Sequence, residues 1–163
     1  MALLYIWLAH PTPPALEIGA PVALLGLLLR AAAASHLKKH HGLVTSGPYA
    51  WTRHPLYLGS AILGAGFLLA AHSWFACGLG IGYFALFYTA AMRREDRKLH
   101  ARHGRAFEEY AARVPAVFPR LSRRGSGDLS PSWALYRRNG EYRAALGLVG
   151  GFALLWLKMR FGA

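Results

Sequence analysis

The sequence predicts an all-α integral membrane protein with four to five membrane helices and a cytoplasmic cap that contains an amphipathic helix. Of its 163 residues, 55% are hydrophobic and only 16% are charged, which is too apolar for a chain with a water-facing surface all round. The apolar residues also form long blocks that basic segments separate. The length fits a single domain over residues 1–163.

Two of these blocks are free of charge. Leu56–Ala71 and Trp74–Met92 contain no Asp, Glu, Lys or Arg, and only His72 and Ser73 lie between them. Long uncharged apolar runs are typical of membrane helices. We therefore expect a hairpin of two membrane helices joined by a tight turn.

Two further blocks are short and carry or adjoin basic residues. Ile18–Ala34 contains Arg30, and Ala144–Leu157 ends at Lys158. Because a span needs about 20 residues, we expect each either to take in flanking residues, with its basic side chain snorkelling, or to cross incompletely. Residues 1–9 lack the basic start and the small-residue cleavage site of a signal peptide, so we expect a short interfacial or fifth helix there.

The net charge of +12 is concentrated in two places. Basic residues lie between the blocks Ile18–Ala34 and Leu56–Ala71 and again over residues 93–143, while the turn at residues 71–74 has none. By the positive-inside rule, both basic segments face the cytoplasm. Anionic lipid headgroups account for this charge, so we expect no nucleic-acid partner. The single Cys77 gives no disulfide framework.

The segment Leu43–Gly59, LVTSGPYAWTRHPLYLG, interrupts the apolar pattern. A residue before proline is disfavoured in the α conformation, so Gly47-Pro48 and His54-Pro55 exclude one continuous helix. Irregular backbone at a membrane boundary persists only where protein or a wet cavity satisfies its polar groups. We therefore expect an ordered cap here, with room for a polar ligand.

Adjacent carboxyl groups, Glu95 and Asp96, follow the hairpin in a chain that has only seven acidic residues. Acids at a membrane boundary are plausible partners for a cationic ligand. Apolar residues at helical spacing then predict an amphipathic helix on the membrane surface over about residues 94–113, with a break or bend at Gly104.

Two histidines, His36 and His40, have the i, i+4 spacing of a metal site. The intervening Lys38 and Lys39 would repel a dication, and no carboxylate or thiol is near in sequence. We expect this segment to contact lipid headgroups and expect no metal site.

A G-x-G-x-G pattern at Gly78, Gly80 and Gly82 lies inside an apolar run, without the preceding strand that a dinucleotide-binding loop needs. The Gly-xxx-Gly spacing of Gly78 with Gly82, and of Gly147 with Gly151, instead predicts close packing of membrane helices.

Five features follow one another in a fixed order: L-V-T-S-G-P-Y, R-H-P-x-Y, a helical hairpin, an acidic pair and H-G-x-x-F-x-x-Y-x-x-x-V-P. In this combination, over about residues 30–119, the sequence resembles the isoprenylcysteine carboxyl methyltransferase family and its relatives, the phospholipid N-methyltransferases. The resemblance implies a membrane enzyme that uses S-adenosylmethionine, with its catalytic half at about 30–120 and an extra C-terminal helix at about 142–161. It implicates the following residues: for cofactor binding Gly47, Pro48, Tyr49, His54, Pro55, Tyr57, Glu95, Asp96 and Tyr110, and for catalysis Arg53, Glu95 and Arg113.

The sequence departs from the family in two features. The acidic pair is usually Glu-Glu, whereas here it is Glu95-Asp96, and the apolar run from Ala144 has no obvious counterpart in the best-known members.

The cofactor has an ammonium and a carboxylate, which need partners of opposite charge. Glu95 or Asp96 suits the ammonium, and Arg53 or His54 suits the carboxylate. A carboxylate acceptor needs no general base, whereas an amine acceptor must first lose a proton, to Glu95 or His54. Because the chain lies in the membrane, we expect a lipid or prenylated acceptor whose polar end reaches the cap.

Other functions stay open at this stage. A phospholipid N-methyltransferase would use the same cap. A sterol-type reductase would use a nicotinamide cofactor instead, and a scaffold or small transporter would bind neither. Binding of S-adenosylhomocysteine against that of NADPH separates these alternatives.

Overall fold

The computed structural model describes residues 2–37, 42–119 and 131–162, and over these ranges it contains helices and no strand. The predicted all-α fold is confirmed. The elements are α1 (Ala2–Leu8), α2 (Pro13–His36), the 3₁₀ turn η1 (Gly47–Ala50), α3 (Pro55–Ala71), α4 (Trp74–His103), α5 (Arg105–Arg113), α6 (Trp133–Arg138) and α7 (Tyr142–Phe161).

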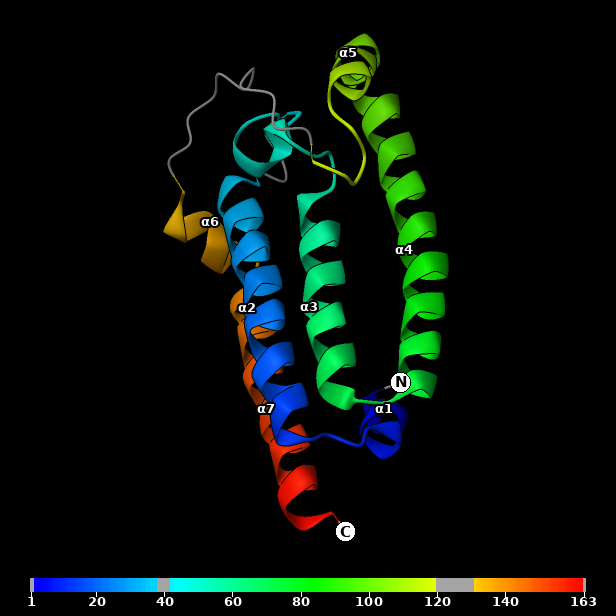
Figure 1. Cartoon of the computed structure of the whole chain (residues 1–163). Coiled ribbons are helices and arrows are strands. Elements are labelled where there is room, and N and C mark those ends of the chain that lie inside the picture. Colours follow the sequence, from blue (N-terminus) through cyan, green and yellow to red (C-terminus); the bar gives the residue numbers. More distant parts are fainter. Residues whose placement is uncertain (1, 38–41, 120–130, 163) are drawn as a thin grey trace.

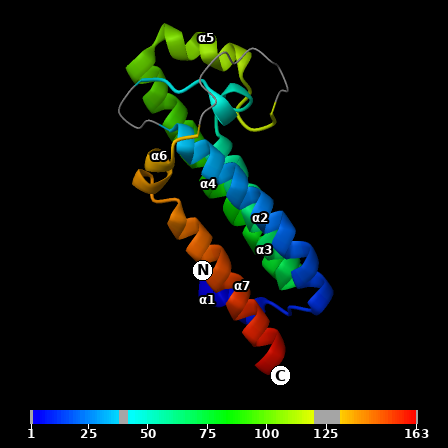
Figure 2. The ribbon, with the colours of Figure 1, turned by 90° about the vertical axis from the view of Figure 1, so that its left-hand side faces the viewer.

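Four of these helices, α2, α3, α4 and α7, run alongside one another as a bundle (Figure 1). Among the described residues α2, α4 and α7 are long and apolar enough to cross a membrane, and α3 is a shorter apolar helix of 17 residues. The segment η1 and helix α5 form a cap at one end of the bundle, and Figure 2 shows α5 lying across that end. Helix α1 lies at the opposite end, and its 7 residues are too few to cross a bilayer.

The predicted hairpin is confirmed. Helix α3 ends at Ala71, and its cap residue His72 adopts a left-handed φ of 47°. Ser73 then caps α4, since its hydroxyl accepts from the backbone N–H of Ala76 at 3.3 Å. The two helices are therefore joined by the two residues expected.

Helices α2 and α3 pack closely through glycines. A Cβ at Gly26 would lie 2.3 Å from the backbone nitrogen of Leu63, and one at Gly66 would lie 2.3 Å from that of Ala23. Backbone atoms of neighbouring helices approach this closely only where the side chain is missing. The prediction for Gly78 and Gly82 of α4 and for Gly147 of α7 was wrong within this chain, because a Cβ at each of them would meet only open space.

These contacts give the first testable prediction. We expect Gly66→Ala to destabilise the protein by about 1–3 kcal/mol, since the added methyl must displace the backbone of α2. Gly64→Ala is the matched control, because Gly64 lies in the same helix and its Cβ would have nothing within 4 Å. Thermal unfolding of the two variants in the same detergent is the measurement, and equal midpoints would contradict the packing.

Helix α4 is longer than predicted. It continues from the membrane segment through the charged run to His103, so residues 94–103 extend the membrane helix and do not begin a surface helix. The expected break occurs at Gly104, with φ 48°, and the amphipathic helix is α5 alone, which buries Phe107 and Tyr110. Glu95 and Asp96 are therefore fixed to a membrane helix.

The basic residues of α2 and α7 contact protein. Arg30 pairs with Glu141 through two contacts, Nε–Oε2 at 3.1 Å and Nη2–Oε1 at 2.9 Å. Lys158 Nζ donates to the carbonyls of Ile6 and Trp7 at 2.7 and 2.8 Å. Both helices took in flanking residues as expected, but Arg30 turns toward a carboxylate and does not simply snorkel. These contacts tie α7 to the bundle at both ends.

Candidate active site

The cap segment is held by α5 and the residues that follow it. Tyr110 Oη donates to the carbonyl of Tyr49 at 2.7 Å. The backbone N–H of Arg53 donates to the carbonyl of Pro115 at 2.9 Å, and that of His54 to Ala116 at 3.2 Å. Irregular backbone next to a membrane therefore finds its partners within the protein.

The turn at Gly47 needs a glycine. Its φ of 60° is left-handed, and a Cβ there would lie 2.5 Å from the His36 ring. Pro48 and Tyr49 follow and are buried. The predicted ordered cap between α2 and α3 therefore contains one short 3₁₀ helix, η1.

Asp96 connects the two halves of the site. Its carboxylate accepts from Arg53 Nη1 at 2.8 Å and lies 3.0 Å from His54 Nε2. Arg53 and Asp96 are 43 positions apart, and the fold brings them together between the cap and α4. The Arg53 guanidinium also lies 5.8 Å from the centre of the Phe107 ring, so α5 supports it from a second direction.

Glu95, unlike Asp96, has no ion-pair partner among the described residues. Among the described residues no basic side chain pairs with it within 4.0 Å. Its negative charge instead acts on His54 and on the tyrosines of the cap, Tyr49 and Tyr57. A half-buried carboxylate without a cationic partner is available for one from a ligand.

Burial dominates the electrostatics of the cap. It raises the pKa of the Tyr49 phenol above its usual range, and the charge of Glu95 adds to the rise. Burial also raises the pKa of Tyr110, which Arg53 partly offsets. For His54, burial lowers the pKa below 6.5 although Asp96 opposes it. His54 is therefore neutral near pH 7.

The lowered pKa of His54 predicts a pH-dependent stability. Above pH 6.5 His54 is neutral in both the folded and the unfolded chain, so its contribution is complete. As the pH falls below 6.5 toward the lowered folded pKa, the unfolded chain binds the proton first and stability is lost. We expect His54→Gln to flatten the acid side of a plot of unfolding midpoint against pH. The exposed His100, changed in the same way, is the control, and a plot that is equally steep in His54→Gln would contradict the assignment.

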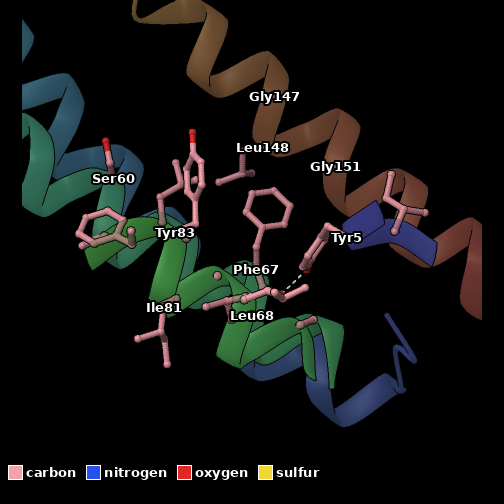
Figure 3. Close-up of a pocket in the computed structure, with 18 of the residues that line it drawn as sticks. Tyr5, Ser60, Phe67, Leu68, Ile81, Tyr83, Gly147, Leu148 and Gly151 are labelled. Carbon is pink, nitrogen blue, oxygen red and sulfur yellow. Dashed lines mark hydrogen bonds between the residues drawn. The ribbon is translucent and has the colours of Figure 1, made fainter. Parts of the chain in front are cut away.

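Below the cap lies an open-sided cavity of about 1030 Å³ lined mainly by α1, α3, α4 and α7 (Figure 3). Its wall is mostly apolar, but Arg30, Ser60 and Tyr88 lie at the end toward the cap. The Tyr88 ring contacts Tyr57 edge-on at 5.5 Å between centres, and Tyr57 contacts the His54 ring at the same distance. An unbroken line of rings thus joins the cavity to the charged cluster.

Most of the residues expected in the site meet in this region. Arg53, His54 and Asp96 are in direct contact, and Glu95 and Tyr57 adjoin them. Pro55 is fully buried at the start of α3. Arg113 is not brought into the cluster by any contact found here: it is exposed, and its Nε donates to the carbonyl of Glu109 in its own helix.

Several residues that contact the cluster were not predicted from the sequence. Thr52 is 2% exposed, and its hydroxyl donates to the carbonyl of Ala116 at 2.9 Å while accepting from the backbone of His54. Phe107, which lies against Arg53, belongs to the H-G-x-x-F motif but was assigned no role there. Tyr88, which lines the cavity, lies in an uncharged apolar block and was not singled out. The heptad spacing from Tyr88 to Glu95 places both on one face of α4, a signal that could have identified Tyr88.

Of the predicted histidine pair, His40 lies outside the described residues. Across residues 2–37, 42–119 and 131–162, no three or more His, Cys, Asp or Glu side chains gather to hold a metal ion. The absence of a metal site stays a prediction.

The partial relatives of this chain among known proteins include the following three. The cobalt-zinc-cadmium resistance protein CzcN of Cupriavidus metallidurans is 43% identical over 105 residues, which are 63% of this chain and 47% of CzcN. Protein-S-isoprenylcysteine O-methyltransferase of Schizosaccharomyces pombe is 31% identical over 86 residues, 53% of this chain and 36% of the relative. Delta(14)-sterol reductase TM7SF2 of Mus musculus is 34% identical over 80 residues, 45% of this chain and 18% of the relative.

The aligned regions thus span less than half the length of each of these relatives. No solved structure matches the chain. The model of the isoprenylcysteine carboxyl methyltransferase (ICMT) family matches residues 22–101, which contain α3 and the cluster of Arg53, His54, Glu95 and Asp96. By this match, together with the partial likeness to the yeast methyltransferase, the segment of residues 22–101 belongs to the isoprenylcysteine carboxyl methyltransferase family.

Proposed function

We propose that this protein is an S-adenosylmethionine-dependent methyltransferase that acts on an amphiphilic acceptor, with carboxyl O-methylation as the reaction it fits best. The observation that carries the proposal is the line of contacts from the apolar cavity through Tyr88 and Tyr57 to His54. A membrane-level cavity with a charged cap at one end matches a molecule with an apolar tail and a reactive polar end.

The charged cluster fits the amino-acid part of the cofactor. Glu95 is a carboxylate without a cationic partner among the described residues, and Arg53 Nε is a buried donor that lacks a hydrogen-bond partner there. An ammonium and a carboxylate would satisfy these two groups. Glu95 would hold the ammonium and Arg53 the carboxylate, while Asp96 keeps Arg53 and His54 in place.

When bound, S-adenosylmethionine supplies a methyl group on a sulfonium, which a nucleophile attacks in line. The protein's contribution is then mainly position: the cap holds the donor side and the cavity aligns the acceptor. Tyr57 and Tyr88 present ring faces and edges between the two, and aromatic rings stabilise cationic groups.

The burial and the Asp96 contact of His54 bear on whether the acceptor is a carboxylate or an amine. His54 is 2% exposed, and its Nε2 already contacts Asp96 at 3.0 Å, so this nitrogen is not free to take a proton from an amine. A carboxylate acceptor is ionised at neutral pH and needs no base. Since Glu95, the other candidate base, is assigned here to the ammonium of the cofactor, this favours O-methylation of a carboxylate over N-methylation of a phospholipid amine.

The cap faces the cytoplasm in this proposal. The acidic pair and α5 carry basic neighbours such as Arg93, Arg94 and Arg97, whereas the turn at the other end of the hairpin has no basic Lys or Arg. The positive-inside rule then places the site where water-soluble cofactor is available.

A methyl-transfer assay tests the proposal. Purified protein in lipid nanodiscs is incubated with methyl-labelled S-adenosylmethionine and either an S-prenylated cysteine with a free carboxylate or phosphatidylethanolamine. A methyl ester releases labelled methanol in alkali, whereas an N-methyl group does not, so the product reveals the reaction. No label in either product, together with no binding of S-adenosylhomocysteine, would refute the function, and binding of NADPH would favour a reductase.

A further inference from the structure

Polar side chains of Arg30, Ser60 and Tyr88 lie in the cavity wall at the end toward the cap. Two of them are satisfied by the protein. Arg30 donates to Glu141 through Nε and Nη2, and to the Ser60 hydroxyl through Nη1. The Ser60 hydroxyl donates in turn to the carbonyl of Leu56 at 2.9 Å. Among the residues that the structure describes, the Tyr88 hydroxyl has no hydrogen-bond partner. A hydroxyl next to hydrocarbon is costly to leave without a partner, so this group is available to a ligand.

The ring of Tyr88 is held from two sides. It stacks on Phe84 of the same helix, with ring centres 3.9 Å apart and ring planes 20° apart. It also contacts Tyr57 of α3 edge-on, at 5.5 Å between centres. Tyr88 lies seven residues before Glu95, which places it two turns or about 10 Å below that carboxylate on the same face of α4. Tyr88 is therefore a rigidly held side chain between the apolar cavity and the carboxylate proposed to hold the cofactor's ammonium.

The charge at this end of the cavity favours an anion. Arg30 lines the cavity, whereas its partner Glu141 is not one of the lining residues. The cationic member of the pair therefore lies nearer to the cavity, and the nearer charge has the larger effect where the dielectric constant is low. A phenol hydroxyl also donates a stronger hydrogen bond to an ionised oxygen than to a neutral one. Both features match a carboxylate and disfavour an ammonium.

We propose that Tyr88 determines specificity for the acceptor by donating a hydrogen bond to its carboxylate, an inference that rests on the proposed function. The hydroxyl holds one carboxylate oxygen and leaves the other free to react, while the apolar tail of the acceptor lies against the apolar part of the cavity wall. The phenol keeps its proton, so Tyr88 binds and orients the acceptor and does not act as a base. Arg30 contributes through its charge and keeps its contacts with Glu141 and Ser60.

Binding of matched probes to Tyr88→Phe tests the inference, because this change removes the hydroxyl and keeps the ring contacts. The probes are an N-acetylated, S-prenylated cysteine with a free carboxylate and the same compound with a carboxamide. In phosphatidylcholine nanodiscs the wild type should prefer the carboxylate. Tyr88→Phe should bind the carboxylate about tenfold more weakly and lose less affinity for the amide. Tyr83→Phe is the control, since Tyr83 also lines the cavity, five residues earlier in α4, and the preference should stay unchanged.

Steady-state kinetics separate a role in binding from a purely structural one. Tyr88→Phe should raise KM for the carboxylate acceptor more than it lowers kcat, and it should leave the affinity for S-adenosylhomocysteine and the unfolding midpoint unchanged. Wild-type affinity for the carboxylate probe in this variant, or equal losses for the two probes, overturns the inference. If phosphatidylglycerol in the nanodisc competes with the carboxylate probe in the wild type but not in Tyr88→Phe, a lipid phosphate is the ligand of the hydroxyl, and the inference is also overturned.

The outcomes separate this inference from the proposed function. Methyl transfer to the carboxylate acceptor with a KM that Tyr88→Phe leaves unchanged refutes only the inference. A preference for the carboxylate that depends on the Tyr88 hydroxyl, without methyl transfer, refutes only the function and leaves the cap end of the cavity as a binding site for an amphiphile with an anionic end.

Discussion

Replacing Glu95 by glutamine is expected to weaken the binding of S-adenosylhomocysteine by about 10- to 100-fold. The amide has nearly the same shape but loses the negative charge that would hold the ligand's ammonium, and a hydrogen bond to a charged group contributes about 1.5–3 kcal/mol. Isothermal titration with the protein in nanodiscs measures the change. The homocysteine product is the right probe because it keeps the ammonium and carboxylate but has no methyl group to transfer.

Glu109→Gln is the matched control for this experiment. Glu109 lies on the exposed face of α5 and pairs with Arg105 at 3.1 Å, where both side chains are largely in water. The same chemical change there removes an equal charge near the cap but should leave ligand affinity unchanged. Equal affinities in wild type and Glu95→Gln would show that another group holds the ammonium, and equal losses in both variants would indicate a general effect of charge.

Replacing Asp96 by alanine is expected to lower both stability and activity. Arg53 and His54 would lose their shared partner, and a poorly solvated charge without a partner costs about 1–3 kcal/mol. The side chains that position the cofactor would also shift, and a misplacement of about 1 Å can lower the rate about 100-fold. Thermal unfolding and kcat/KM measured on the same preparation test both parts.

Asp96→Asn gives the graded comparison. The asparagine oxygen can still accept from Arg53, and its amide can donate to His54 Nε2 if the imidazole changes tautomer. We therefore expect the asparagine variant to keep most of the stability while losing the charge that fixes Arg53. An alanine variant as stable and active as wild type would mean that the contacts of Asp96 are incidental.

The sequence predicted which distant segments come together better than it predicted the helix packing. The approach of the R-H-P segment to the acidic pair followed from motif order, because the hairpin between them returns the chain to the same end of the bundle. The division of work between Glu95 and Asp96 could not be predicted. Adjacent residues on a helix point about 100° apart, and only the position of Arg53 shows which carboxylate meets it.

The errors have a common physical origin. Gly-xxx-Gly spacing identifies a smooth helix face but does not say whether another helix lies against it. Close packing was therefore predicted at Gly78 and Gly82, whereas the structure has it at Gly26 and Gly66. Arg30 was expected to snorkel because it interrupts an apolar block. Its pairing with Glu141 could not be foreseen, because Glu141 is 111 positions away and follows a segment without apolar pattern. A contact between distant elements leaves no local trace in either one.

The continuity of α4 has a mechanical consequence. One helix of 30 residues runs from the turn at Ser73 past the cavity wall to Glu95 and on to His103, without a hinge before Gly104. Such a helix acts as a rigid lever, so a change of its tilt in a thinner or thicker bilayer moves the cavity wall and Glu95 together. Bilayer thickness would thereby change the binding of the proposed acceptor and of the proposed cofactor together.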